Sequence, residues 1–174
     1  AQRARELDPL AHRSDLATEL LRAGRLQEAV ELGARIVELE PGFSRGHAVF
    51  GWACLLAGRQ AEGVAALERA VALSEGGTLF LGQLGQACAM TGEVARARDV
   101  LRRLHALSGQ GYVSPYHFAY VHTGLGEDEA ALDWLERAFE ERAGAIYGIK
   151  GSFLFKSLRS HPRFTALLKK MNLA

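Results

Sequence analysis

Four glycines recur at a constant interval of 34 residues along the chain. Gly24, Gly58, Gly92 and Gly126 each interrupt an amphipathic run without a proline, as in CLLAGR around Gly58. Glycine costs about 1 kcal/mol inside a helix, but it is the favoured residue where a chain leaves a helix in the left-handed conformation. The constant interval therefore predicts one helix-turn-helix unit repeated four times.

The residues on both sides of each glycine support this interpretation. Leu20, Cys54, Cys88 and His122 stand four residues before the glycines, and the small residues Ala29, Gly63, Ala97 and Ala131 stand five residues after them. Residues spaced by three and four lie on one face of a helix, and small side chains allow two helices to approach closely. Each unit is expected to be a helix, a tight turn and a second, antiparallel helix.

The repeat divides the chain into six parts. Residues 1–9 are expected to end a preceding helix or repeat, as if the chain were cut from a longer one. Units one to four span residues 10–43, 44–77, 78–111 and 112–145, and residues 146–174 form a C-terminal cap. Ser44, Thr78 and the Ser114-Pro115 pair suit helix starts, because serine and threonine favour the N-cap and proline the first turn.

The cap is expected to contain one more helix. Ser160 and Pro162 suit its start, and its apolar face at helical spacing consists of Phe164, Leu167, Leu168 and Met171. A stack of repeats needs such an end piece, because its last repeat would otherwise expose an apolar face to water.

The 34-residue pattern resembles the tetratricopeptide repeat family, whose motif is W-x2-L-G-x2-Y, then A-x3-F, then P. Unit two has His47, Phe50, Gly51 and Cys54 at the first four positions, and unit three has Leu81, Leu84, Gly85 and Cys88, then Ala97 and Leu101. No unit keeps the leading Trp, and only unit one keeps the closing Pro, as Pro41. The resemblance implies an all-α fold, a right-handed superhelical solenoid of four such helix pairs plus a C-terminal capping segment.

The stretch from Tyr112 to Leu173 has a second, narrower resemblance. It is similar to the closing segment of bacterial multi-repeat proteins in which the repeats follow a winged-helix, serine/threonine kinase or cyclase domain. That resemblance implies a C-terminal docking or sensory module of a bacterial signalling protein.

No motif in the chain points to catalysis. Gly124-Leu125-Gly126 begins like a dinucleotide loop, but Glu129 stands where the third glycine belongs and a helix precedes the turn. Nucleophile-elbow, P-loop and H-E-x-x-H motifs are absent from the sequence. His117 and His122, the closest histidines, are five residues apart and so face apart on a helix. We expect no enzyme, with no catalytic residue, cofactor or metal.

The sequence also indicates the cellular compartment and whether the chain inserts in a membrane. No run approaches the roughly 18 to 20 apolar residues that cross a bilayer, and the N-terminus lacks a signal-peptide pattern. Cys54 and Cys88 share one repeat position and are expected to be too far apart for a disulfide. The chain is expected to be cytoplasmic and not inserted in a membrane, although buried thiols would also survive in a periplasmic or extracellular setting.

The 21 basic and 20 acidic residues are unevenly distributed. The seven basic residues after Glu141, where no acid follows, are Arg142, Lys150, Lys156, Arg159, Arg163, Lys169 and Lys170, which leaves 14 basic against 20 acidic residues before them. One interpretation is a surface for a polyanion or an acidic partner. The other is a cap screened by Glu136, Glu140 and Glu141, and the wide spread of the seven charges argues against nucleic acid.

In the resembled family, the first helices of the repeats line a concave groove that binds partners. The groove positions correspond to Arg45, Val49, Trp52 and Leu56 in unit two, Gln83, Gln86 and Met90 in unit three, and Tyr116, His117 and Tyr120 in unit four. Trp52 and Tyr120 are expected either to anchor a protein segment, with Arg45, Gln83 and Gln86 holding its polar groups, or to be ordinary core between repeats.

These observations predict a non-catalytic scaffold that binds a protein or peptide ligand in the groove. Two alternatives stay open. The chain could be a structural module that self-associates into oligomers or filaments through an exposed N-terminal repeat face. It could instead be a regulator domain that binds a polyanion through the basic cap.

Overall fold

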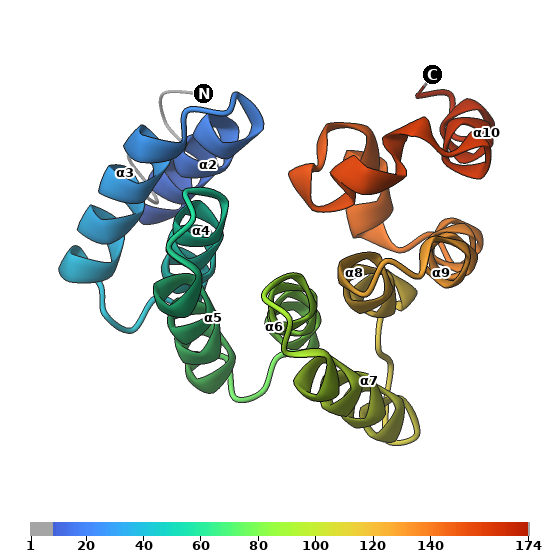
Figure 1. The fold of residues 1–174 in the computed structure, drawn as a ribbon, viewed down its shortest axis with the longest axis horizontal. Coiled ribbons are helices and arrows are strands. Elements are labelled where there is room, and N and C mark those ends of the chain that lie inside the picture. The colour runs from blue at the N-terminus through green and yellow to red at the C-terminus, as the bar shows by residue number, and fades with distance from the viewer. Residues whose placement is uncertain (1–8, 174) are drawn as a thin grey trace. The chain divides into compact units, whose positions relative to one another are not determined.

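The computed structural model describes residues 9–173, and all regular secondary structure in this range is helical (Figure 1). The all-α prediction is therefore confirmed, whereas the superhelical arrangement of the repeats stays a prediction. The chain forms two compact units, Ala1–Phe80 and Leu81–Ala174. The helix expected to end at residues 1–9 lies outside the described residues, except for Pro9, which begins the first described helix.

The helices alternate between first and second members of pairs. The first helices are α2 (Pro9–Arg22), α4 (Ser44–Leu56), α6 (Thr78–Met90) and α8 (Pro115–Gly124). The second helices are α3 (Leu26–Leu39), α5 (Gln60–Leu73), α7 (Val94–Ser108) and α9 (Asp128–Glu140), and their first residues are 34 positions apart. The φ angles at Gly24, Gly58, Gly92 and Gly126 are 73°, 85°, 88° and 71°. The predicted left-handed turns are thus confirmed.

The predicted helix starts are correct in position, but the capping chemistry differs. Ser44 is the first residue of α4, and its N-cap is Phe43. Ser114 is the N-cap of α8 with Pro115 in the first turn, yet the Ser114 side chain accepts no capping hydrogen bond. Helix α4 therefore starts without the expected serine cap.

In the N-terminal compact unit, helices α4 and α5 approach each other through two glycines. A Cβ atom added to Gly63 would lie 2.7 Å from the backbone oxygen of Gly51 and 2.9 Å from the backbone nitrogen of Leu55. Backbone atoms cannot move aside to relieve such a clash, whereas the end of a flexible side chain can. Glycine at position 63 is therefore a requirement of this helix contact.

In the C-terminal compact unit, α8, α9 and the cap share one core. The cap comprises two 3-10 helices, η1 (Gly144–Gly151) and η2 (Phe153–Ser160), and the final helix α10 (Pro162–Lys170). Phe164, Leu167 and Met171 are buried and Leu168 is partly buried against this core, as the sequence pattern predicted. The N-cap of α10 is His161, whose side chain accepts a hydrogen bond from the backbone nitrogen of Arg163.

Candidate functional site

The expected groove residues of unit two all lie on α4, and the structure buries the proposed anchor among them. The Trp52 side chain is 3% exposed and Val49 is 8% exposed, while Leu56 is partly buried. Arg45 is exposed and forms an ion pair with Asp15 of α2. Trp52 is therefore a core residue, and the hypothesis that it anchors a ligand is wrong.

The expected groove residues of units three and four lie on α6 and α8. Tyr116, Tyr120 and Gln86 are 3%, 5% and 2% exposed, respectively. Gln83 and His117 are partly buried, whereas Met90 is 49% exposed. Tyr120 is thus not an exposed anchor either, so the prediction of two accessible aromatic anchors is wrong in both compact units.

Tyr120 and Tyr116 are covered by the aromatic ring of Phe155, which belongs to η2 of the cap. The Phe155 ring stacks on the Tyr120 ring with centroids 5.3 Å apart and an interplanar angle of 10°. It meets the Tyr116 ring edge-on, with centroids 5.1 Å apart and an angle of 67°. Phe155 itself is 0% exposed. The chain's own C-terminal segment therefore covers Tyr116 and Tyr120, two of the residues at which the sequence predicted a ligand.

The same segment is also held through its backbone. The Gln86 side chain on α6 donates a hydrogen bond from Nε2 to the backbone oxygen of Leu154, and the nitrogen-to-oxygen distance is 2.6 Å. The backbone of Phe155 is non-helical, with φ −112° and ψ 24°, and so interrupts η2. We call Gln86, Tyr116 and Tyr120, together with the Leu154 and Phe155 that they hold, the Phe155 site.

Burial sets the protonation of two neighbouring groups. The pKa of Tyr120 lies well above its usual value, chiefly because burial disfavours the phenolate, and its hydroxyl hydrogen-bonds with the side chains of Gln83 and Tyr116. Burial lowers the pKa of His117 to about 4. Both side chains are therefore neutral near pH 7, and neither supplies a charge with which to bind a ligand.

The basic cap is partly neutralised within the chain. The Arg163 guanidinium forms ion pairs with Glu129, Asp133 and Glu136 of α9. Glu136 was expected to screen the cap, as was Glu141, but Glu141, the C-cap of α9, pairs with Arg137 of that helix. Arg163, one of the seven basic residues, is therefore compensated by acidic residues of α9.

The described part of the chain offers neither a cluster of metal ligands nor a membrane-spanning helix. Among residues 9–173, no three His, Cys, Asp or Glu side chains lie close enough together to hold a metal ion. Within the same range, no helix combines the length and the apolar character that a bilayer crossing demands. Leu16 of α2 is 48% exposed, but much of the expected N-terminal self-association face falls outside the described residues.

The sequence reasoning missed Leu154 and Phe155 as part of the site. A signal was present, because Phe153, Leu154 and Phe155 form an apolar run in a segment that is otherwise basic and rich in glycine and serine. The run has no counterpart in the 34-residue repeat, so the periodic pattern could not assign it a place.

Comparisons with protein-family models and with curated proteins give no match to this chain. The resemblance to tetratricopeptide repeats therefore rests on the glycine interval, the small residues and the motif positions.

Proposed function

We propose that the chain is a non-catalytic protein-interaction module of tetratricopeptide-like helix pairs that binds a segment of a partner protein on the faces of its first helices. The strongest support is the set of contacts that join Gln86, Tyr116 and Tyr120 to Leu154 and Phe155. In this proposal the C-terminal segment occupies part of the binding surface until a partner segment replaces it.

The contacts at the Phe155 site are of the kind that recognises a peptide. A side-chain amide binds a backbone carbonyl, which any sequence offers, and two tyrosine rings enclose one aromatic side chain, which few sequences offer. Backbone hydrogen bonds contribute affinity in peptide recognition, and side-chain pockets contribute specificity. A partner segment with a phenylalanine in the same position would satisfy the same groups.

A partner segment must bind at least as strongly as the chain's own C-terminal segment does. Burying a phenylalanine side chain contributes about 1.5–3 kcal/mol, an aromatic pair about 0.5–1.5 kcal/mol and a hydrogen bond about 0.5–1.5 kcal/mol. The sum is a few kcal/mol, which a partner segment can match only by making equivalent contacts. The site is therefore expected to discriminate strongly for an aromatic residue.

The test uses a labelled synthetic peptide with the sequence of residues 151–160, GSFLFKSLRS, and the full chain carrying Phe155→Ala. Removing the ring weakens the tethered segment by about 3–5 kcal/mol, so the peptide in solution can enter the vacated site. We expect the peptide to bind the variant at least about tenfold more tightly than the wild-type chain, which corresponds to about 1.4 kcal/mol. Fluorescence anisotropy measures both affinities.

Two controls accompany this experiment. The exposed Lys156→Ala substitution lies in the same segment and should leave peptide binding as weak as in the wild type. A peptide with alanine at the position of Phe155 should not bind the Phe155→Ala chain. Equal binding of both peptides, or equal binding to wild-type and variant chains with unchanged helicity, would show that the site does not recognise a peptide.

A further inference from the structure

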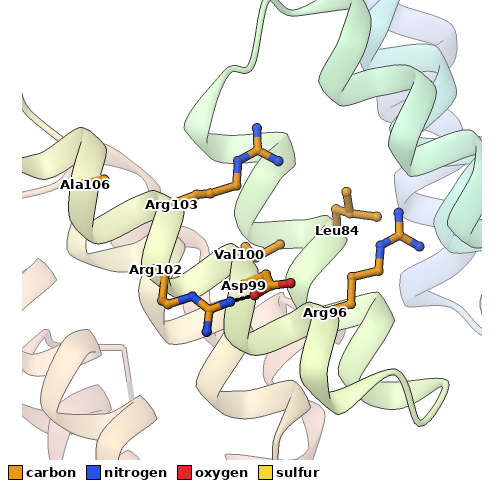
Figure 2. A pocket seen from close by; sticks show the side chains of 7 residues that line it. All are labelled: Leu84, Arg96, Asp99, Val100, Arg102, Arg103 and Ala106. Atoms are coloured by element: carbon orange, nitrogen blue, oxygen red, sulfur yellow. Dashed lines mark ion pairs between the residues drawn. The ribbon is translucent and has the colours of Figure 1, made fainter.

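A second surface, which shares no residue with the Phe155 site, lies on the C-terminal compact unit. It is a hollow of about 530 Å³ between Leu84 of α6 and six residues of α7. Three of these six are arginines, Arg96, Arg102 and Arg103, and one is acidic, Asp99. We call it the arginine hollow. In the view of Figure 2, the Arg96 and Arg103 side chains lie on either side of Leu84, and Arg102 is turned to Asp99.

The spacing of residues on α7 explains how one helix supplies these cations. Arg96 and Arg103 are seven residues apart, which is close to two turns, so they lie on one helix face. Val100 lies between them and is 3% exposed, and Leu84 on α6 is 5% exposed. The guanidinium groups of Arg96 and Arg103 thus flank two buried apolar side chains, Leu84 and Val100.

The cations of the hollow are not fully compensated. Asp99 forms an ion pair with Arg102, and Glu93 forms one with Arg96 at 3.1 Å between nitrogen and oxygen. Within the described residues, Arg103 has no ion-pair partner. When Asp99 and Glu93 are counted against the three arginines, one positive charge, that of Arg103, is left without an acidic partner.

We propose that the arginine hollow is a docking site for an acidic segment of a partner protein. A guanidinium group binds a carboxylate through two parallel hydrogen bonds, and this geometry favours arginine over lysine at such sites. Arg103 can bind a partner's carboxylate without breaking an existing ion pair. Exposed ion pairs contribute little stability, so a second carboxylate can exchange with Glu93 or Asp99 at small cost.

The lining favours a protein segment over nucleic acid. Polynucleotide binding draws on several phosphate contacts, whereas only Arg103 of the lining lacks an acidic partner, and the buried Leu84 and Val100 between the arginines suit an apolar side chain. A peptide can place its acidic side chains beside Arg96 and Arg103 and a small or apolar side chain over Leu84 and Val100. This inference goes beyond the proposed function, because neither site depends on the other.

The test uses the full chain and a labelled peptide of alternating glutamate and alanine residues. Arg103→Gln removes the unpaired cation, and the expected result is about three- to fivefold weaker binding. Arg35→Gln on α3 makes the same charge change at an exposed position outside the hollow and should alter the affinity by less than about twofold. Arg103→Lys keeps the charge without the planar fork, and we expect intermediate binding.

Four results would overturn the proposal. The first is an equal loss for Arg103→Gln and Arg35→Gln, which indicates attraction by net charge alone. The second is equal affinity for a peptide in which glutamine replaces every glutamate. The third is tighter binding of a single-stranded oligonucleotide of the same length, with the same dependence on Arg103. The fourth is no binding of the glutamate peptide at millimolar concentration.

Discussion

Replacing Gly63 by leucine is expected to lower the free energy of unfolding of the N-terminal compact unit by at least about 3 kcal/mol. Leucine is the better helix former by about 1 kcal/mol, so propensity alone predicts stabilisation. The steric cost of placing a side chain between α4 and α5 is larger than this gain. Even a Cβ atom would lie 2.5 Å from Leu55 Cγ and 2.7 Å from the Gly51 oxygen, so α4 and α5 must separate.

Urea unfolding followed by circular dichroism measures this effect. Ala65→Leu is the matched control, because Ala65 lies on the same helix and is exposed, and it should change stability by less than about 0.5 kcal/mol. If Gly63→Leu unfolds at the urea concentration of the wild type, the close approach of α4 and α5 through Gly51 and Gly63 is wrong.

Replacing Phe155 by alanine is expected to cost the C-terminal compact unit about 3–5 kcal/mol. The ring is fully buried and contacts Tyr116 and Tyr120, so its loss leaves a cavity and uncovers both tyrosines. The same urea experiment measures the loss, and tyrosine fluorescence reports the exposure.

Tyr147→Ala is the control for the loss of an aromatic ring in the cap. Tyr147 lies on η1 and is 57% exposed, so its replacement should cost less than about 0.5 kcal/mol. Equal effects of Phe155→Ala and Tyr147→Ala would mean that Phe155 does not reach the tyrosines.

Helix boundaries were predictable from the sequence because their signals are local. Gly58 adopts a φ of 85°, which glycine tolerates without steric cost, and the same requirement recurs at each of the four turns. Small residues at fixed distances from these glycines predicted the close helix pairs for the same reason. Gly63, for example, touches residues of the helix that immediately precedes it.

The Phe155 site was not predictable, because its contacts join distant parts of the chain. Gln86 and Leu154 are separated by 68 residues, and the repeat period carries no information about where the cap returns. Periodicity placed Tyr120 on a first helix but could not say what covers it. The sequence thus predicted that Tyr120 lies on a first helix, and it missed the cap residue that covers Tyr120.

The arginine hollow was not predictable from the sequence for a different reason. Along the sequence, the excess of basic residues lies after Glu141, in the cap. In the structure, Arg163 of that cap is paired with three acids, whereas Arg103 on α7 has no ion-pair partner among the described residues. The distribution of charge along a sequence does not show which basic side chains form ion pairs in the folded protein.

Proton NMR of the full chain tests most directly whether the Phe155 ring of the C-terminal segment lies against Tyr116 and Tyr120. The ring centroids of Phe155 and Tyr120 are 5.3 Å apart. We expect nuclear Overhauser cross-peaks from the Phe155 ring to the rings of Tyr116 and Tyr120. A Phe155 ring with the chemical shifts of an exposed phenylalanine and no cross-peak to either tyrosine would contradict this expectation.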